Sequence, residues 1–214
     1  SALDYYQQIY SSSMFSSIPV LEGLRILRKS VDCQFLLGDF RKCKELLDRA
    51  DDIVSTGMQN DPDGGFIILR ARFQVRRASL FRESSQLHDC LRMAKMAFSV
   101  LALTDEHKDV ARLQAVMGVA HHRLGRLEKA EEFYNDSLAT YRRIGFDLGV
   151  ANLLNNLALL KKNKCLWEPA LSLMEKATNL ANQIGASHLL PAFYLNQGIV
   201  LTKSNRLGEA VPFL

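Results

Sequence analysis

A period of forty residues is the feature of this sequence that most restricts its fold. Small residues recur at this spacing at Ala130, Ala170 and Ala210, and Cys90 lies forty residues before the first of them. Two further columns keep the same spacing, one of small residues (Ala78, Gly118, Ala158, Gly198) and one of large apolar residues (Leu127, Trp167, Leu207). A fixed period of this length indicates a repeat architecture, in which each unit buries its apolar face against its neighbours.

Each repeat contains two amphipathic segments of helical periodicity, separated by a short turn. We expect helices at 109–124 and 127–143, at 149–163 and 167–183, and at 189–204. In the second of these segments the apolar residues follow the helical period, whereas Glu and Lys lie opposite them. Helix-favouring residues dominate the composition, and only 5 of the 214 residues are Pro. The sequence therefore predicts an all-α fold, an α-α superhelix (right-handed solenoid) of about five helical hairpins.

The organisation of the chain follows from the same period. We expect repeats near 20–54, 66–103, 109–143, 149–183 and 189–214, the last of them truncated. The first repeat lies seven residues further from the second than the forty-residue period requires. The extra residues fall in the segment 55–65, whose turn-forming residues predict a surface loop. Residues 1–19 are interpreted as the second helix of a preceding repeat and its exit loop. Because the chain opens on Ser1 and ends within a helical segment, we expect it to be a fragment of a longer protein.

These columns, together with the turns "GDF" at 38–40 and "GRL" at 125–127, resemble the tetratricopeptide repeat family over about residues 20–214. The period is forty rather than the family's usual value of about 34. The segments 144–156 and 184–196 resemble the longer repeats of bacterial signalling and transcriptional regulators. The resemblance implies a non-catalytic scaffold that binds protein or peptide, and that serves as the sensor or interaction region of a larger regulatory protein. The four cysteines, none of them in C-x-x-C spacing, favour a reduced, cytoplasmic setting.

The resemblance also implies a binding surface, because the first helix of each pair lines the concave groove in this family. An Asn side chain both donates and accepts hydrogen bonds, so it can hold an extended backbone, and Arg can bind a carboxylate with two hydrogen bonds. The segment 66–82 carries five Arg and no acidic residue. We therefore expect an extended protein or peptide segment of acidic character as the partner. The predicted groove residues are Arg72, Arg76, Arg112, Asn152, Asn155, Asn156 and Asn196.

A second function stays open, that of a structural or oligomerisation module whose groove is filled by another copy or by a neighbouring domain. Its basis is the apolar end "EAVPFL", which could pair two chains into a homodimer through the ends of the array. Direct nucleic-acid binding is not favoured, because the net charge is only +4 and the basic residues are not interleaved with stacking aromatics. No apolar run reaches the roughly 18 residues of a membrane-spanning helix.

The motifs that would indicate catalysis or a bound cofactor are missing from the sequence. It has no phosphate-binding loop, no nucleophile elbow and no zinc-protease helix, so we expect neither an enzyme nor a cofactor. His121 and His122 point about 100° apart on a helix, so we expect a solvated or groove-facing pair and no metal site. Cys43 and Cys90 stand in the small-residue column, which predicts buried structural thiols.

Overall fold

The computed structural model describes residues 19–58 and 64–213, and these residues contain ten α-helices and no strand. The all-α prediction is confirmed, whereas the helix and exit loop expected over residues 1–19 lie, apart from Pro19, outside the described residues. The α-helices are α2 (Val20–Leu36), α3 (Phe40–Gly57), α4 (Gly65–Glu83), α5 (Leu87–Leu101), α6 (His107–Arg123), α7 (Leu127–Arg143), α8 (Asp147–Asn163), α9 (Trp167–Gln183), α10 (Leu190–Lys203) and α11 (Leu207–Ala210). Of the helices whose bounds were predicted, α6 and α8 begin two residues earlier than expected, and the other bounds differ by at most one residue.

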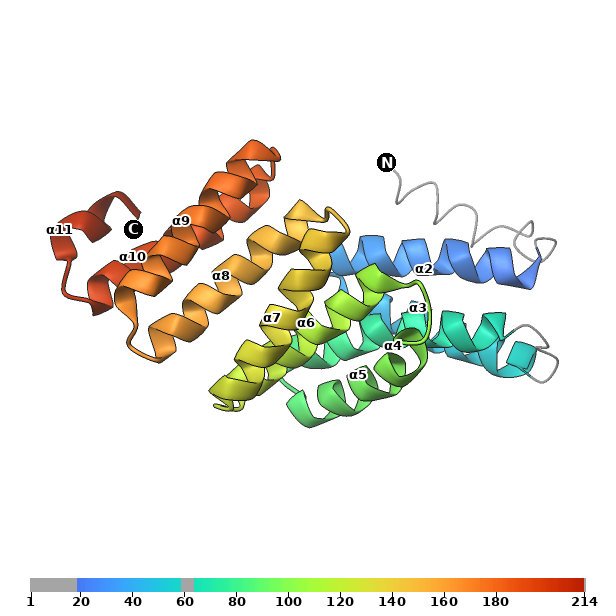
Figure 1. Ribbon diagram of the computed structural model, residues 1–214. Helices are drawn as coiled ribbons and strands as arrows, with labels where there is room; N and C mark the ends of the chain where they lie inside the picture. The colour runs from blue at the N-terminus through green and yellow to red at the C-terminus, as the bar shows by residue number, and fades with distance from the viewer. Residues whose placement is uncertain (1–18, 59–63, 214) are drawn as a thin grey trace. The chain divides into compact units, whose positions relative to one another are not determined.

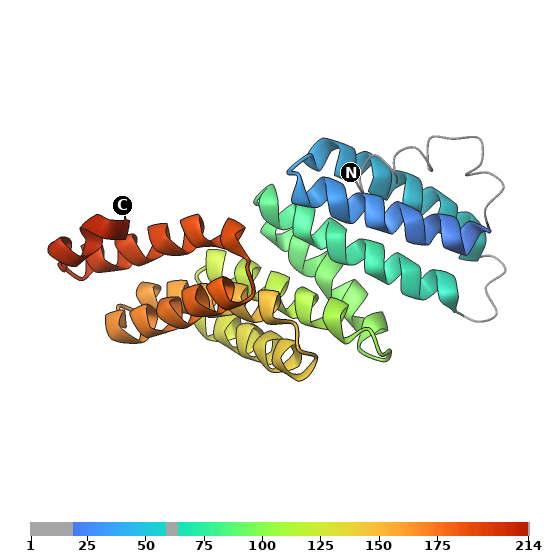
Figure 2. The same ribbon diagram turned by 90° about the horizontal axis from the view of Figure 1, so that it is seen from above.

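The helices form two compact units, one ending at Asp109 and the other beginning at Val110. The first unit contains α2 to α5, and the second contains most of α6 and all of α7 to α11. Within each unit the helices follow one another in chain order as antiparallel hairpins, as Figures 1 and 2 show. In the first unit Leu24, Leu47 and Phe73 are buried in a core that joins α2, α3 and α4. In the second unit Tyr134 and Leu153 are buried in the corresponding core.

The forty-residue period is present in the backbone as well as in the sequence. The turn inside each hairpin contains one residue in the left-handed conformation. At all five of these turns a backbone N–H donates a hydrogen bond to the carbonyl five residues before it, as Arg126 does to His121 at 2.9 Å. A bond of this kind satisfies a carbonyl that the helix end leaves without a partner. The left-handed residues are Gly38, Ser85, Gly125, Cys165 and Asn205, and the last four are spaced by forty.

Ser85 occupies a backbone conformation that Gly would adopt at lower cost. Its φ is +59°, and its side chain is exposed. A left-handed conformation costs an L-residue about 1–2 kcal/mol, and Gly avoids this cost. Part of the gain is lost, because Gly also makes the unfolded chain more flexible. The Ser85→Gly variant is therefore expected to gain about 0.5 kcal/mol of unfolding free energy in urea denaturation. The matched variant Ser84→Gly changes a residue at φ −79° and should lose stability; an equal response of the two variants would contradict this account.

The small-residue columns lie where helices approach closely. A Cβ atom at Gly118 on α6 would stand 2.5 Å from Cδ1 of Tyr134 on α7, so only Gly fits there. Ala130 and Cys90 are fully buried, as is Cys43, and burial raises the pKa of the Cys43 thiol to about 11. The prediction of structural thiols at Cys43 and Cys90 is confirmed.

The two adjacent histidines pack within the second unit instead of facing solvent. His121 is 6% exposed, and its ring stacks on Phe133 with a centroid distance of 5.4 Å. His122 is half-buried, its Nε2 lies 2.8 Å from the Asn163 amide nitrogen, and burial lowers its pKa. The expectation of a solvated or groove-facing pair is wrong for His121, because the apolar side of α7 covers the C-terminal end of α6. None of the described helices is both long and apolar enough to cross a membrane.

Candidate functional site

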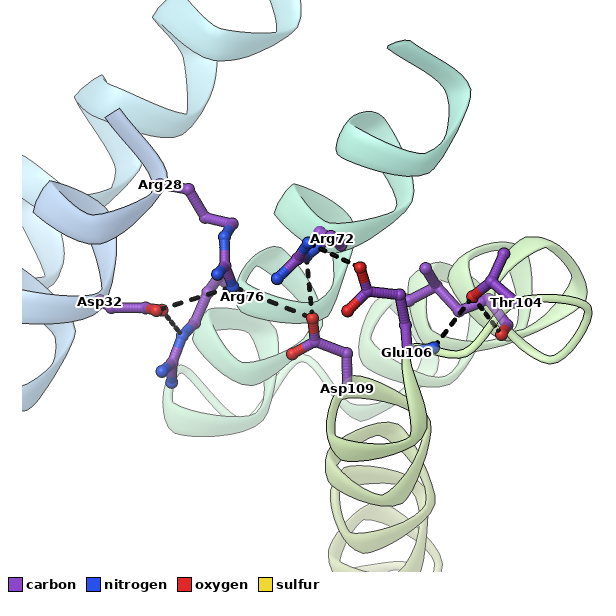
Figure 3. Close-up of polar contacts among 8 residues, drawn as sticks. Arg28, Asp32, Arg72, Arg76, Thr104, Glu106 and Asp109 are labelled. Carbon is purple, nitrogen blue, oxygen red and sulfur yellow. Dashed lines mark hydrogen bonds and ion pairs between the residues drawn. The ribbon is translucent and has the colours of Figure 1, made fainter. Parts of the chain in front are cut away.

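Two of the predicted groove residues, Arg72 and Arg76, lie on α4 in the first unit. Arg76 is only 8% exposed. Its Nε donates a hydrogen bond to Oδ1 of Asp32 on the neighbouring helix α2, as Figure 3 shows. Its guanidinium group also lies 4.9 Å from the centre of the Phe35 ring, a cation–π contact. The Arg76 side chain is therefore fixed between α2 and α4.

Arg72 is held by two acidic residues at the end of the first unit. Its Nε donates to Asp109 Oδ2 at 3.1 Å, and its Nη1 donates to Glu106 Oε1 at 2.7 Å (Figure 3). Arg28 on α2 adds longer ion pairs, at 3.8 Å to Asp109 and at 3.9 Å to Asp32. Three cations and three carboxylates thus meet on this face. We call them the ion-pair cluster: Arg28, Asp32, Arg72, Arg76, Glu106 and Asp109.

The turn after α5 positions the two later acids of the cluster. Thr104 Oγ1 donates to the Leu101 carbonyl at 2.8 Å and accepts from the Glu106 N–H at 3.3 Å. These bonds shape the turn that leads into α6, whose first turn contains Asp109. Asp109 is 5% exposed, and the positive end of a helix dipole favours a carboxylate at this position.

The acidic residues of the ion-pair cluster were missed by the sequence analysis. The run "TDEHKD" at 104–109 is a signal for Glu106 and Asp109, since it places three acids just before and at the start of α6. Other arginines of α4 also find acids, as Arg77 does with Asp48 at 2.9 Å and with Asp51 at 2.8 Å. Three of the five arginines of the segment 66–82, Arg72, Arg76 and Arg77, are therefore paired with acidic residues of other segments.

The predicted asparagines lie in the second unit, on α8 and α10. Asn155 is 8% exposed, and its Oδ1 accepts a hydrogen bond from Asn196 Nδ2 at 3.1 Å, which joins the two helices. Asn152 is exposed and donates to the Leu148 carbonyl at 2.9 Å. Asn156 is half-buried, one helical turn after Asn152, and its amide makes no hydrogen bond with any described residue.

The arrangement in the second unit can bind a polar backbone. The amide of Asn156 retains its donors and its acceptor, and the Asn155–Asn196 bond fixes the amides beside it. The predicted groove residue Arg112 is half-buried on α6 in the same unit. Among the described residues no group of three or more His, Cys, Asp or Glu side chains is arranged to hold a metal ion.

Together, the consecutive hairpins, the left-handed turns and the small-residue columns define a helical repeat protein. The tetratricopeptide repeat family model matches residues 69–143, so the resemblance seen in the sequence is confirmed for the type of repeat. A search of the curated proteins finds no sequence match.

Solved structures share the fold at low sequence identity. BtubC from P. vanneervenii has a TM-score of 0.69 at 19% identity, over 100% of this chain and 84% of that one. The Rap conjugation gene regulator of plasmid pLS20, solved with the Phr* peptide, has a TM-score of 0.69 at 18% identity, over 91% and 52%. A signal transduction ATPase with a tetratricopeptide repeat sensor from Pyrococcus horikoshii has a TM-score of 0.68 at 13% identity, over 99% and 34%. These likenesses concern the fold alone, and this chain spans about half of the Rap regulator.

Proposed function

We propose that this chain is a non-catalytic scaffold that binds an extended segment of protein or peptide along the first helices of its hairpins. The observation that carries the proposal is the amide of Asn156, which is half-buried and makes no hydrogen bond with any described residue. The preceding residue, Asn155, is hydrogen-bonded to Asn196, which joins α8 to α10 next to this position in the chain. A backbone segment can use such amides whatever its side chains are.

The regulatory role is the finer part of this proposal. The Rap regulator was solved with a bound peptide, and the Pyrococcus protein is described as having a repeat sensor. By this analogy of fold, the chain is the sensor or interaction region of a larger bacterial regulator, such as a transcriptional regulator, that acts in the cytoplasm. The acidic character expected of the partner receives no support from Arg72 and Arg76, because they already pair with Asp32, Glu106 and Asp109.

The alternative of a structural or oligomerisation module draws on the ion-pair cluster. Because Arg72 and Arg76 bind acids of their own chain, this part of the predicted groove contributes to cohesion of the first unit instead of offering free cations. In this alternative the face that carries Asn152, Asn156 and Asn196, here called the asparagine face, is covered by another copy or by a neighbouring domain.

Peptide binding by the wild-type chain and by the Asn156→Ala variant tests the proposal. An array of immobilised peptides of unrelated sequence selects binders of the wild type, and their affinities are then measured by fluorescence anisotropy. We expect Asn156→Ala to weaken the selected peptides about five-fold, the effect of losing one backbone hydrogen bond.

The control for this experiment is Asn182→Ala, which removes an exposed amide from α9. It should leave the selected peptides bound as by the wild type. Unchanged affinity of every selected peptide for Asn156→Ala would contradict the proposed site, and concentration-dependent dimerisation that Asn156→Ala abolishes would favour the alternative module.

A further inference from the structure

A pocket of 300 Å³ lies in the first unit, where the start of α3 meets the end of α4. Phe40, Leu80 and Phe81 form its apolar part, and Lys44 and Arg77 supply cationic groups. The one carboxylate of the lining, Glu83, is paired with Arg82. Arg77 is already paired with Asp48 and Asp51, whereas Lys44 makes no ion pair with any described residue. The pocket therefore combines an apolar floor with one cation that has no counterion.

Exposed apolar residues continue from the pocket along the turn between α2 and α3. Leu36 is 81% exposed, Leu37 is 64% exposed, and Phe40 is 42% exposed. When the hairpins are aligned on their left-handed residues, the place of Leu36 is taken in the other turns by Glu83, Arg123, Asn163 and Lys203. The first turn is thus the one described hairpin turn with an apolar side chain at this place. Single exposed apolar residues are common on protein surfaces, but three adjacent ones form a patch of the kind that marks an interaction site.

The equivalent place in the second unit, between α7 and α8, is closed by ion pairs. On the same alignment Glu131 stands in the place of Lys44, and Lys161 and Lys164 stand in the places of Phe81 and Ser84. Glu131 accepts hydrogen bonds from Lys161 Nζ at 2.5 Å and from Lys164 Nζ at 2.7 Å. These bonds lower the pKa of the Glu131 carboxyl.

The comparison of the two places shows what the first unit lacks. In the second unit a carboxylate on one helix meets cations on the next, and the contact is complete within the chain. In the first unit the carboxylate is replaced by Lys44, and the first of the two cations is replaced by Phe81. The same position is left open and apolar, and Lys44 has no counterion among the described residues.

We propose that this pocket binds a segment of a partner protein in which a large apolar side chain stands next to a carboxylate. The apolar side chain packs against Phe40, Leu80 and Phe81, and the carboxylate pairs with Lys44. A second copy of this chain fits less well, because a symmetric contact through this patch would bring Lys44 and Arg41 of each copy against those of the other. The surface is distinct from the asparagine face, so the inference does not depend on the proposed function.

Two short peptides test this pocket in the intact chain. The probes are the acetylated and amidated tetrapeptides Gly-Phe-Glu-Gly and Gly-Phe-Gln-Gly, titrated into ¹⁵N-labelled protein at low salt and followed by NMR. We expect the amide signals of Leu80, Phe81 and Ser84 to shift. The Glu peptide should bind about three-fold more tightly than the Gln peptide, as an exposed ion pair allows.

Variants of the chain sharpen the result. Lys44→Gln should remove the preference for Glu, whereas Lys95→Gln, at an exposed lysine of α5, should keep it. The double variant Lys44→Glu/Phe81→Lys rebuilds the pair seen at Glu131 and Lys161, and it should abolish the shifts while its circular dichroism stays that of the wild type.

Three outcomes would overturn the proposal. They are equal affinity of the two peptides for the wild type, shifts confined to residues away from the pocket, and a preference for Glu that survives in Lys44→Gln. Dilution of the protein without peptide provides a further check. If the same three amide signals move with protein concentration, a second copy occupies the pocket and the proposed partner is wrong.

Discussion

The Gly118→Val variant is expected to lose about 3 kcal/mol of unfolding free energy. The Cβ of any side chain at this position would stand 2.5 Å from Tyr134 Cδ1 and 2.6 Å from Cε1. The Tyr134 ring is 1% exposed and lies in the core of the second unit, so it cannot move aside without disturbing its neighbours. Urea denaturation followed by circular dichroism measures the loss.

The matched control for this variant is Gly208→Ala. No atom lies within 4 Å of a Cβ placed at Gly208, and the residue is helical and exposed. Because Ala favours helix over Gly, this substitution should be neutral or slightly stabilising. A Gly118→Val variant as stable as Gly208→Ala would show that the close approach of α6 and α7 is not required.

Asp32→Asn should have the second-largest effect, a loss of about 2 kcal/mol. The substitution removes the negative charge that pairs with Arg76, whose side chain is largely buried. Breaking a buried ion pair from one side costs about 3–5 kcal/mol, and the partial exposure of Asp32 reduces that figure. The measurement is again the free energy of unfolding in urea.

A double-mutant cycle separates the ion pair from other effects of the substitution. Arg76→Met together with Asp32→Asn should cost less than the sum of the two single variants, because neither charge is then left behind. Glu22→Gln, which breaks an exposed ion pair with Arg25 on the same helix as Asp32, should change the stability little. Additive effects of the two single variants would mean that the contact between Arg76 and Asp32 contributes no coupling.

The hairpins could be predicted from the sequence because the residues that produce a hairpin recur in every repeat. A left-handed turn residue, a close approach and an apolar stripe recur every forty residues, and Gly125, Gly118 and Ala130 carry these signals in one repeat. Ser85 and Cys165 hold the same left-handed position without a Gly, so their turns are recognised by register and not by residue type.

The electrostatics of the first unit could not be predicted in the same way. The sequence places Arg72 and Arg76 on one face of α4, but it does not say which acids lie opposite. The pairing partners come from α2 and from the turn after α5, so the balance of charge depends on the approach of separate helices. Asn155 and Asn196 were identified as candidates, whereas their mutual hydrogen bond follows only from the packing of α8 beside α10.

The left-handed turns also bear on how fast each unit folds. The bond that closes each turn joins residues five apart, and most packing joins a helix to the next one along the chain. Contacts that are local in sequence require little loop closure before they form, and proteins rich in them fold in microseconds to milliseconds. Each hairpin can thus serve as a nucleus to which the next hairpin is added, so that no distant part of the chain has to arrive first.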